Sequence, residues 1–444
     1  MNSSLVARLG IVVAMTTWLC LSGCSGPTQE PQPVQESPPS VAEPAPPAEK
    51  PAPKGRESTA TAEDVQATQA RLDALGAQAQ VTIVPDQVLT GIVIRDGSNL
   101  TADDIALFGR LTDLETLQIY NFRDMNDEMV ANLTGLSNLA RLAITNSVIT
   151  DASVETIVRA FPELRELDLS SNTLITSSVM RVIAELTGLE RLTLIQNNFN
   201  DLGTTHLSKL QNLRALDLRG NMEAGDMTLE VVGQLPRLAS LRHRTTTVTD
   251  FGMESLSNSQ TLDSLLIQDF MITSMSGEHL AKLENLTQLE IFRCQGFGSE
   301  GVQALAGMKL TRLTLRDLPM VDDSALQVLP ELPHLRRLYL HELASISDFG
   351  LENLAALQSL ELLDIWEVPQ MSDATVEVIA NLPNLKQLSI RTTGVTDAAI
   401  DKLLEMPNLE SLTFKENGMV TAEGLKKLSG KKFRMLDIGP AGGS

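Results

Sequence analysis

The chain has 444 residues, of which 43% are apolar and 3% aromatic, and its net charge is −21. This apolar content is enough for a large core, while the acidic balance argues against nucleic-acid binding by the protein as a whole. Of the three cysteines only Cys294 lies beyond residue 24, so burial rather than disulfides must hold the fold together.

A secretory signal is predicted at residues 1–23. Arg8 precedes an apolar run, Leu9 to Leu21, that is too short to span a bilayer. The sequence "LSGC", ending at Cys24, resembles the lipobox of bacterial lipoproteins, in which cleavage precedes a cysteine that is then lipidated. The resemblance implies a lipidated Cys24 and a membrane anchor in the cell envelope, outside the cytoplasm, with the outer membrane as one option. The alternatives are an ordinary secretory signal and an uncleaved short anchor.

Residues 24–57 are predicted to be a disordered tether between the lipid and a folded domain. They hold ten of the twenty prolines and almost no large apolar residue, so they cannot bury enough surface to fold. A chain of this composition is extended and serves as a spacer.

Residues 58–88 are predicted to cap the domain that follows. Thr61 and Asp64 have the spacing of a capping box at the start of a helix. Val65, Leu72 and Leu75 fall on one face of that helix, and the "VTIV" that begins at Val81 favours a strand.

One frame recurs through residues 89–438: an aliphatic residue, two variable residues, an aliphatic, one variable and another aliphatic. Fifteen copies follow one another, and every interval is 24 or 25 residues. The copies begin at Leu89, Leu114, Leu139, Leu164, Leu189, Leu213, Leu238, Leu262, Leu286, Leu310, Leu335, Leu360, Leu385, Leu409 and Phe433. Within a copy the alternation predicts a short strand, with the fourth and sixth positions facing one way and the third, fifth and seventh the other.

A helix is predicted after each strand. Segments such as "VTDFGM" at Val248 and "VTDAAI" at Val395 place a Thr before an Asp, as a helix N-cap and its first turn require. The aspartates occur singly, one to a repeat, so solvated structural carboxylates are favoured over a calcium site.

These features resemble the leucine-rich repeat family, and the "ITDxGL"-type element resembles its cysteine-containing subclass. The resemblance covers residues 89–438 and implies an α/β solenoid, or horseshoe, with a parallel concave sheet and a helical convex side. The ninth position departs from the subclass, because only Cys294 keeps the cysteine. Members of the subclass often carry an F-box for ubiquitin ligases, a role that we do not transfer because no such segment precedes the repeats and the lipobox implies bacteria. Residues 439–444 are predicted to be a tail without a cap.

No catalytic or metal-binding motif is evident, so we predict a protein that is not an enzyme and needs no cofactor or metal. The five histidines lack the spacing of metal ligands, and no nucleophile or phosphate-binding motif occurs at a strand–helix junction. His243 is interpreted as a hydrogen-bonded core residue rather than a base, and Cys294 as a small buried hydrophobe rather than a nucleophile.

Large aromatic residues fall on the predicted concave lining, formed by the third, fifth and seventh positions of the repeats. Both tyrosines, Tyr120 and Tyr339, lie there, together with Trp366, the only tryptophan beyond residue 23. A candidate partner-binding cluster is made of Arg316, Tyr339, His341, Trp366 and Arg391 on adjacent strands. Arg, Tyr and Trp are the residue types that dominate binding hot spots.

The same lining is predicted to be basic, with eleven basic against six acidic residues. Its basic members are Arg95, Arg141, Arg191, Arg219, Arg242, Arg244, Arg312, Arg316, Arg337, Arg391 and Lys415. Arg219, Arg242 and Arg244 form a purely cationic group suited to a carboxylate, sulfate or phosphate. The eighth position carries six acidic residues against one basic residue, Arg293: these acids are Asp96, Asp269, Asp317, Glu342, Glu367 and Glu416. If their side chains lean inward, ion pairs cancel the excess.

The predicted function is non-catalytic protein–protein recognition on the concave face of a lipid-anchored, extracytoplasmic domain. The alternative is binding of an acidic polysaccharide or another anionic polymer on the concave arginine rows, with Trp366 and Tyr339 stacking on sugar rings. Protein binding predicts a modest dependence on salt, and polyanion binding a steep one.

Overall fold

The computed structural model describes residues 60–84 and 88–439, which belong to one compact unit, residues 57–444. The predicted signal at 1–23, the lipidation site Cys24 and the tether at 24–57 lie outside the described residues, as does most of the predicted tail. In the part of the chain that is described, no helix is both long and apolar enough to cross a membrane.

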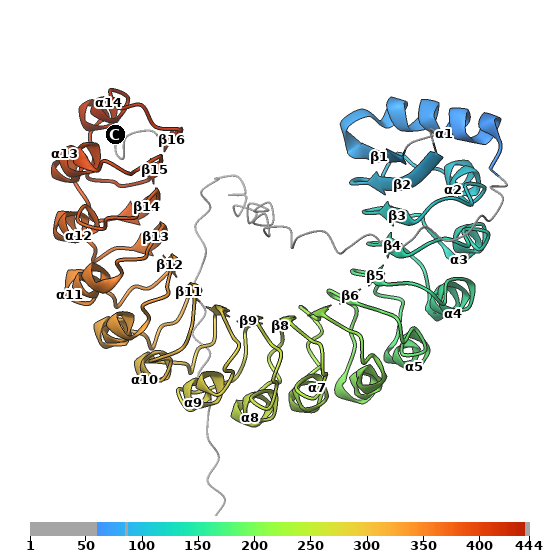
Figure 1. Cartoon of the computed structure of the whole chain (residues 1–444), viewed down its shortest axis with the longest axis horizontal. Coiled ribbons are helices and arrows are strands. Elements are labelled where there is room, and N and C mark those ends of the chain that lie inside the picture. The colour runs from blue at the N-terminus through green and yellow to red at the C-terminus, as the bar shows by residue number, and fades with distance from the viewer. Residues whose placement is uncertain (1–59, 85–87, 440–444) are drawn as a thin grey trace, which may run out of the picture. The chain divides into compact units, whose positions relative to one another are not determined.

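The strands form one sheet of sixteen, in chain order, within the described residues (Figure 1). Strand β1 pairs antiparallel with β2, and every later pair is parallel. The strands are β1 (Ala79–Val84), β2 (Val88–Ile94), β3 (Thr116–Ile119), β4 (Arg141–Ile144), β5 (Glu166–Asp168), β6 (Arg191–Thr193), β7 (Ala215–Asp217), β8 (Ser240–Arg244), β9 (Ser264–Gln268), β10 (Gln288–Phe292), β11 (Arg312–Arg316), β12 (Arg337–His341), β13 (Leu362–Val368), β14 (Gln387–Thr393), β15 (Ser411–Lys415) and β16 (Met435–Ile438).

A helical segment follows each of the parallel strands up to β15. The α-helices are α1 (Ala62–Leu75), α2 (Ala102–Phe108), α3 (Asp127–Ala131), α4 (Asp151–Ala160), α5 (Met180–Ile183), α6 (Asp201–Thr204), α7 (Asp226–Val232), α8 (Asp250–Leu256), α9 (Ser276–Ala281), α10 (Ser299–Gln303), α11 (Asp348–Leu351), α12 (Asp373–Ile379), α13 (Asp397–Glu405) and α14 (Ala422–Leu428). The 3-10 helices are η1 (Gly76–Gln78), η3 (Ser177–Val179), η4 (Thr205–Lys209), η5 (Asp323–Glu331) and η6 (Glu352–Ala356). Within the unit the strands line the inner side of the repeats and the helices the outer side (Figure 1). The predicted α/β leucine-rich-repeat solenoid is thereby confirmed.

Helix α1 and strand β1 cover the amino-terminal end of the stack (Figure 1). Thr61 is the N-cap of this helix, and its hydroxyl accepts a hydrogen bond from the backbone N–H of Asp64 at 3.1 Å. Leu72 is buried in the core, and Val65 and Leu75 pack against it. Strand β1 pairs with the edge of β2 that faces away from β3, so β1 is the end strand of the described sheet.

The core is a ladder of aliphatic residues from equivalent repeat positions. Leu338 and Leu340, the fourth and sixth positions of one repeat, are fully buried and pair in register with Leu363 and Ile365 of the next. Each repeat thus buries its leucines against its two neighbours, as in other solenoids. At the carboxyl end, Leu436 in β16 is only half-buried, because no further repeat covers it in the described chain.

Buried amides at the ninth position hold the loops that follow the strands. The Asn221 side-chain N–H groups donate to the carbonyl oxygens of Leu194 at 2.6 Å and Leu218 at 2.9 Å. Its Oδ1 accepts from the backbone N–H groups of Asn197 and Phe199. Such residues satisfy backbone groups that the interior would otherwise leave without partners.

The aspartates at the helix starts join neighbouring repeats, which corrects their interpretation as solvated caps. Asp348 accepts hydrogen bonds from the backbone N–H of Ser372 at 2.9 Å and from the Ser372 hydroxyl, although Ser372 caps the next helix. We call this series the aspartate ladder. Its other members bond Asp127 to Thr150, Asp151 to Thr176, Asp226 to Thr249, Asp250 to Thr273, Asp323 to Ser347, Asp373 to Thr396 and Asp397 to Thr421.

Most eighth positions have a left-handed backbone. Gly220 has φ 83°, and eleven other residues adopt φ between 50° and 61°. These are Asn121, Asn146, Ser171, Gln196, Asp269, Arg293, Asp317, Glu342, Glu367, Thr392 and Glu416. This conformation costs non-glycine residues about 1–2 kcal/mol each. It ends the alternation of the strand, and at Asp269 and Glu342 it places the eighth-position side chain beside the seventh-position arginine of the preceding repeat.

Candidate functional site

Parallel pairing in register gathers the predicted partner-binding residues on four neighbouring strands. Arg316 of β11 faces His341 of β12, which faces Trp366 of β13, which faces Arg391 of β14. Tyr339 lies two residues before His341 on the same strand. The structure therefore brings the five residues together, and we call them the aromatic cluster.

Trp366 lies half-buried at the centre of the aromatic cluster. The guanidinium carbon of Arg316 is 5.2 Å from the centroid of the Trp366 ring, and that of Arg391 is 5.3 Å away. The His341 ring meets the indole edge-on at a centroid distance of 5.7 Å. Two cation–π contacts and one aromatic contact thus hold the indole in place and leave part of it on the surface.

The charged tips of the cluster are paired with carboxylates. Arg316 bonds Glu342 at 2.9 Å, and Arg391 lies 3.3 Å from Asp364, which is also 3.3 Å from His341 Nε2. Burial alone would raise the pKa of Asp364, but the nearby His341 ring, 3.3 Å away, and the positive charge of Arg391 hold it below its usual value. The site is therefore close to electrically neutral, with an aromatic centre.

Tyr339 completes the cluster on the side of β11. Its ring contacts the His341 ring edge-on at a centroid distance of 5.9 Å, and the guanidinium carbon of Arg312 lies 4.8 Å from its centroid. Burial raises the pKa of the Tyr339 hydroxyl, so the phenol stays protonated at neutral pH and can donate a hydrogen bond.

The expectation of a purely cationic group at Arg219, Arg242 and Arg244 is wrong. Arg219 bonds Asp217 at 2.9 Å, and Arg244 bonds Asp269 at 2.6 Å. Arg242 lies 3.9 Å from the same Asp217, and burial together with the charge of Arg219 lowers its pKa. Asp269 reaches Arg244 because its left-handed backbone turns its side chain toward the preceding repeat.

Ion pairs of this kind engage most of the basic side chains predicted on the lining. Seven of the eleven basic residues predicted there lie within 4 Å of a carboxylate: Arg191, Arg219, Arg242, Arg244, Arg316, Arg391 and Lys415. Of the six eighth-position acids, Asp269 and Glu342 lean inward onto lining arginines, so the structure realises only in part the case in which these acids cancel the excess.

His243 and Cys294 lie in the core, outside the aromatic cluster. His243 is fully buried, with Nε2 2.8 Å from the carbonyl oxygen of Ala224 and Nδ1 3.3 Å from that of Leu218. Burial raises the pKa of the Cys294 thiol to about 12, so the sulfur is not a thiolate at neutral pH. No group of three or more potential metal ligands occurs among the described residues.

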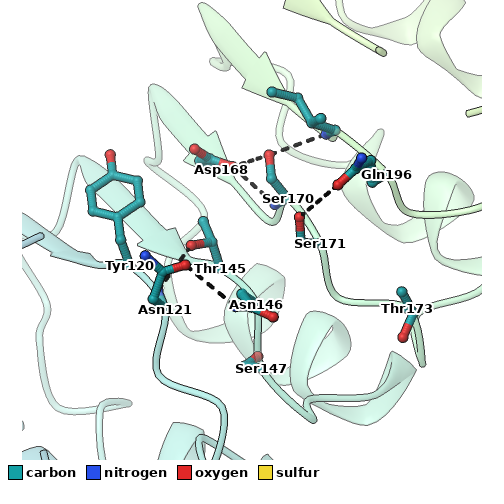
Figure 2. Close-up of a pocket in the computed structure, with 11 residues that line it drawn as sticks. Tyr120, Asn121, Thr145, Asn146, Ser147, Asp168, Ser170, Ser171, Thr173 and Gln196 are labelled. Atoms are coloured by element: carbon teal, nitrogen blue, oxygen red, sulfur yellow. Dashed lines mark hydrogen bonds between the residues drawn. The ribbon is translucent and has the colours of Figure 1, made fainter. Parts of the chain in front are cut away.

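Sequence reasoning missed a polar pocket in the amino-terminal repeats. It has a volume of about 600 Å³ and lies where β3, β4, β5 and β6 end (Figure 2). Tyr120, Asp168 and Gln196 line it, with side-chain amides and hydroxyls between them. The available signal was the run of neutral polar residues at the eighth position of four successive repeats.

A row of exposed apolar side chains was also missed. Leu202, Met227 and Phe251 are the second residues of α6, α7 and α8, and Met275 directly precedes α9. Phe251 is 76% exposed and Leu202 75%. We call these four residues the apolar edge row. Its signal in the sequence is a large apolar residue immediately after the helix-start aspartate, as in "TDF" at Thr249.

Comparisons with known proteins agree with this architecture. A family model described as a leucine-rich repeat region matches residues 147–422, which is more than half of the chain. No curated protein matches the chain in sequence.

Solved structures show a similar arrangement. One is the yeast complex of Rad7 and Elc1, matched at 17% identity and a TM-score of 0.52 over 79% of this chain and 92% of that chain. An internalin of Listeria monocytogenes matches at 23% identity and a TM-score of 0.49, over 74% of this chain and 94% of that chain. A leucine-rich repeat protein of Leptospira interrogans matches at 19% identity and a TM-score of 0.45, over 74% and 84%. At these identities the likeness to the yeast structure supports the fold alone.

Proposed function

Because the chain belongs to the leucine-rich repeat family, we propose that it recognises a protein partner on the concave surface of its repeats, with the aromatic cluster at the centre of the interface. Leucine-rich repeat domains are typically non-catalytic binding scaffolds. The observation that carries the proposal is the half-buried indole of Trp366, held between Arg316 and Arg391. Large, pre-positioned Trp, Tyr and Arg side chains supply most of the energy in protein interfaces.

The charge of the aromatic cluster favours a protein over an anionic polymer. Arg316 and Arg391 are already bonded to Glu342 and Asp364, so a polyanion would have to displace these carboxylates. A protein can instead cover the aromatic area and contact the paired charges at the rim, which makes binding only modestly dependent on salt.

The proposed setting is the cell envelope. Support comes from the sequence "LSGC" at Leu21 to Cys24, which resembles a lipobox and would leave the domain lipid-anchored outside the cytoplasm, and from the "ITDxGL"-type elements, which resemble the cysteine-containing subclass of repeats. Cys24→Ala should abolish incorporation of labelled fatty acid and release the protein from the membrane fraction. A Cys24→Ala protein that still incorporated the label would contradict the anchor without affecting the binding site.

The binding site is tested with a partner captured from envelope extracts by residues 58–444. Trp366→Ala should weaken its binding by about thirtyfold or more, because truncating a hot-spot residue costs at least about 2 kcal/mol. Phe251→Ser is the matched control, since it removes a large exposed ring from the apolar edge row. Tryptophan fluorescence of residues 58–444 reports on Trp366 alone and should shift when the partner binds.

Three results would contradict the proposal. Binding that survives Trp366→Ala but not Phe251→Ser would move the interface to the apolar edge row. A steep loss of affinity with salt would favour an acidic polysaccharide or another polyanion. A blue-shifted emission that the partner leaves unchanged would show that Trp366 is only a packing residue.

A further inference from the structure

The polar pocket of the amino-terminal repeats differs in chemistry from the rest of the concave surface. The eighth positions beside it are the neutral residues Asn121, Asn146, Ser171 and Gln196, all with φ between 51° and 61°. From β9 onward most of the equivalent positions are charged, and several of them form ion pairs. The described lining of the pocket contains no Lys, Arg or His.

Two pairs of amides and hydroxyls in the pocket are only loosely engaged with each other. The Asn146 amide donates to Asn121 Oδ1 at 3.4 Å, and the Ser171 hydroxyl donates to Gln196 Oε1 at 3.5 Å (Figure 2). Both distances are longer than those of well-formed hydrogen bonds. Amides and hydroxyls each offer hydrogen-bond donors and acceptors. This lining therefore suits a ligand whose groups both donate and accept hydrogen bonds.

Asp168 supplies the one carboxylate in the pocket lining. Its Oδ1 accepts hydrogen bonds from the backbone N–H of Ser170 at 2.9 Å and from the Ser170 hydroxyl at 2.6 Å. Both bonds go to the same oxygen, so Oδ2 is available to accept from a ligand. A carboxylate without a cation in the pocket repels anions, which excludes phosphate, sulfate and uronate groups as the favoured ligands.

Tyr120 provides an apolar surface at the end of the pocket opposite Gln196 (Figure 2). Its ring is half-buried, and its hydroxyl has no hydrogen-bond partner among the described residues. Burial and the charges of Asp168 and Glu166 raise its pKa to about 12, so the phenol remains a donor. Ile195 adds a second apolar group to the lining.

We infer that this pocket binds a neutral saccharide. Sugar hydroxyls are both donors and acceptors, as the amides, hydroxyls and Asp168 require, and the C–H face of a sugar ring suits the ring of Tyr120. The volume, about 600 Å³, falls within the range of small-molecule sites, about 300–1,000 Å³. The inference adds a second site to the proposed function and does not depend on the aromatic cluster.

Calorimetry of the folded protein with neutral trisaccharides of glucose, galactose, mannose and N-acetylglucosamine tests the inference. At least one trisaccharide should bind with an affinity that is insensitive to salt. Tyr120→Ala should weaken it about tenfold or more, since the variant loses both a stacking ring and a hydrogen-bond donor. Tyr120→Phe keeps the ring and should weaken it less. Phe349→Ala is the matched control, because it removes an exposed aromatic ring outside both proposed sites and should leave sugar binding unchanged.

A charged ligand pair separates this inference from acidic-polymer binding. The galacturonic acid trimer should bind at least about tenfold more weakly than the galactose trimer, and Asp168→Asn should reduce that difference. Absence of binding by every neutral trisaccharide, tighter binding of the uronate, or equal binding by wild type and Tyr120→Ala would each overturn the inference. Thermal melting of each variant confirms that a loss of binding is not a loss of folding. Failure here leaves the Trp366 test untouched, because the two sites lie on different strands.

Discussion

Replacing Asp348 with Asn should destabilise the protein by about 2–4 kcal/mol at neutral pH. The Asp348 carboxylate accepts hydrogen bonds from the backbone N–H of Ser372 at 2.9 Å and from the hydroxyls of Ser372 and Thr375. A hydrogen bond to a charged group contributes about 1.5–3 kcal/mol. The three bonds share one carboxylate and are not additive, and an Asn oxygen can keep one of them, so the loss is smaller than their sum.

The effect should depend on pH in a defined direction. Burial alone would raise the pKa of Asp348, but the hydrogen bonds from Ser372 and Thr375 lower it below the unfolded value of about 3.9. A carboxyl group whose pKa is lowered by folding stabilises the protein above the unfolded pKa, and this contribution is lost as the pH falls through the folded pKa. The difference between wild type and Asp348→Asn should therefore be full at neutral pH and shrink at about pH 3.

Asp103→Asn is the matched control for this variant. Asp103 lies exposed in the first turn of α2, and its side chain forms no hydrogen bond or ion pair among the described residues. Urea denaturation followed by circular dichroism measures both variants at both pH values. Equal losses in the two variants, or a loss in Asp348→Asn that is the same at neutral and acidic pH, would refute the role assigned to the aspartate ladder.

Two further predictions concern the core. Leu340→Ala should lower the free energy of unfolding by about 2–5 kcal/mol, because Leu340 is fully buried between two repeats. Leu436→Ala, in the half-buried last strand, should lower it by less. Equal losses in the two variants, measured by denaturation, would contradict a nearest-neighbour stack. Burial lowers the pKa of His243 although its bonds to Ala224 and Leu218 oppose this, so wild-type stability should fall as the pH drops below about 6.5, the unfolded pKa. His243→Leu should remove that part of the pH dependence in melting experiments, and an unchanged slope would contradict it.

Features that repeat along the chain were predictable from the sequence. The alternation at Leu338 and Leu340 and its return every 24 or 25 residues define a strand, its buried face and its neighbours. Helix starts were predictable from the Thr-Asp pair, because the Thr bonds its own helix. The hydrogen bonds that the Asp accepts could not be predicted, because their donor lies a full repeat away, as Ser372 does from Asp348.

The charge of the concave surface could not be predicted without knowing the backbone conformation at the eighth position. Residues as different as Arg293, Thr392 and Glu416 share the left-handed conformation at the eighth position, so residue type gives no sign of it there. That conformation turns Glu342 toward Arg316 and Asp269 toward Arg244. The amino-terminal pocket was missed for a related reason, since each of its amides and hydroxyls is ordinary alone and only their grouping is informative.

One backbone therefore carries two surfaces whose chemistry is set by the residue at a single repeat position. A carboxylate there, as at Glu342, neutralises an arginine and leaves an aromatic centre exposed, whereas an amide, as at Asn146, leaves a neutral polar hollow. Strands β6 and β11 are five strands apart, roughly 20 Å or more at about 4.8 Å per strand. Because each repeat contacts only its neighbours, Trp366→Ala should leave saccharide binding unchanged, and Tyr120→Ala should leave protein binding unchanged. If either change altered both activities, the ligands would share one site, and the division of the concave surface into two sites would have to be abandoned.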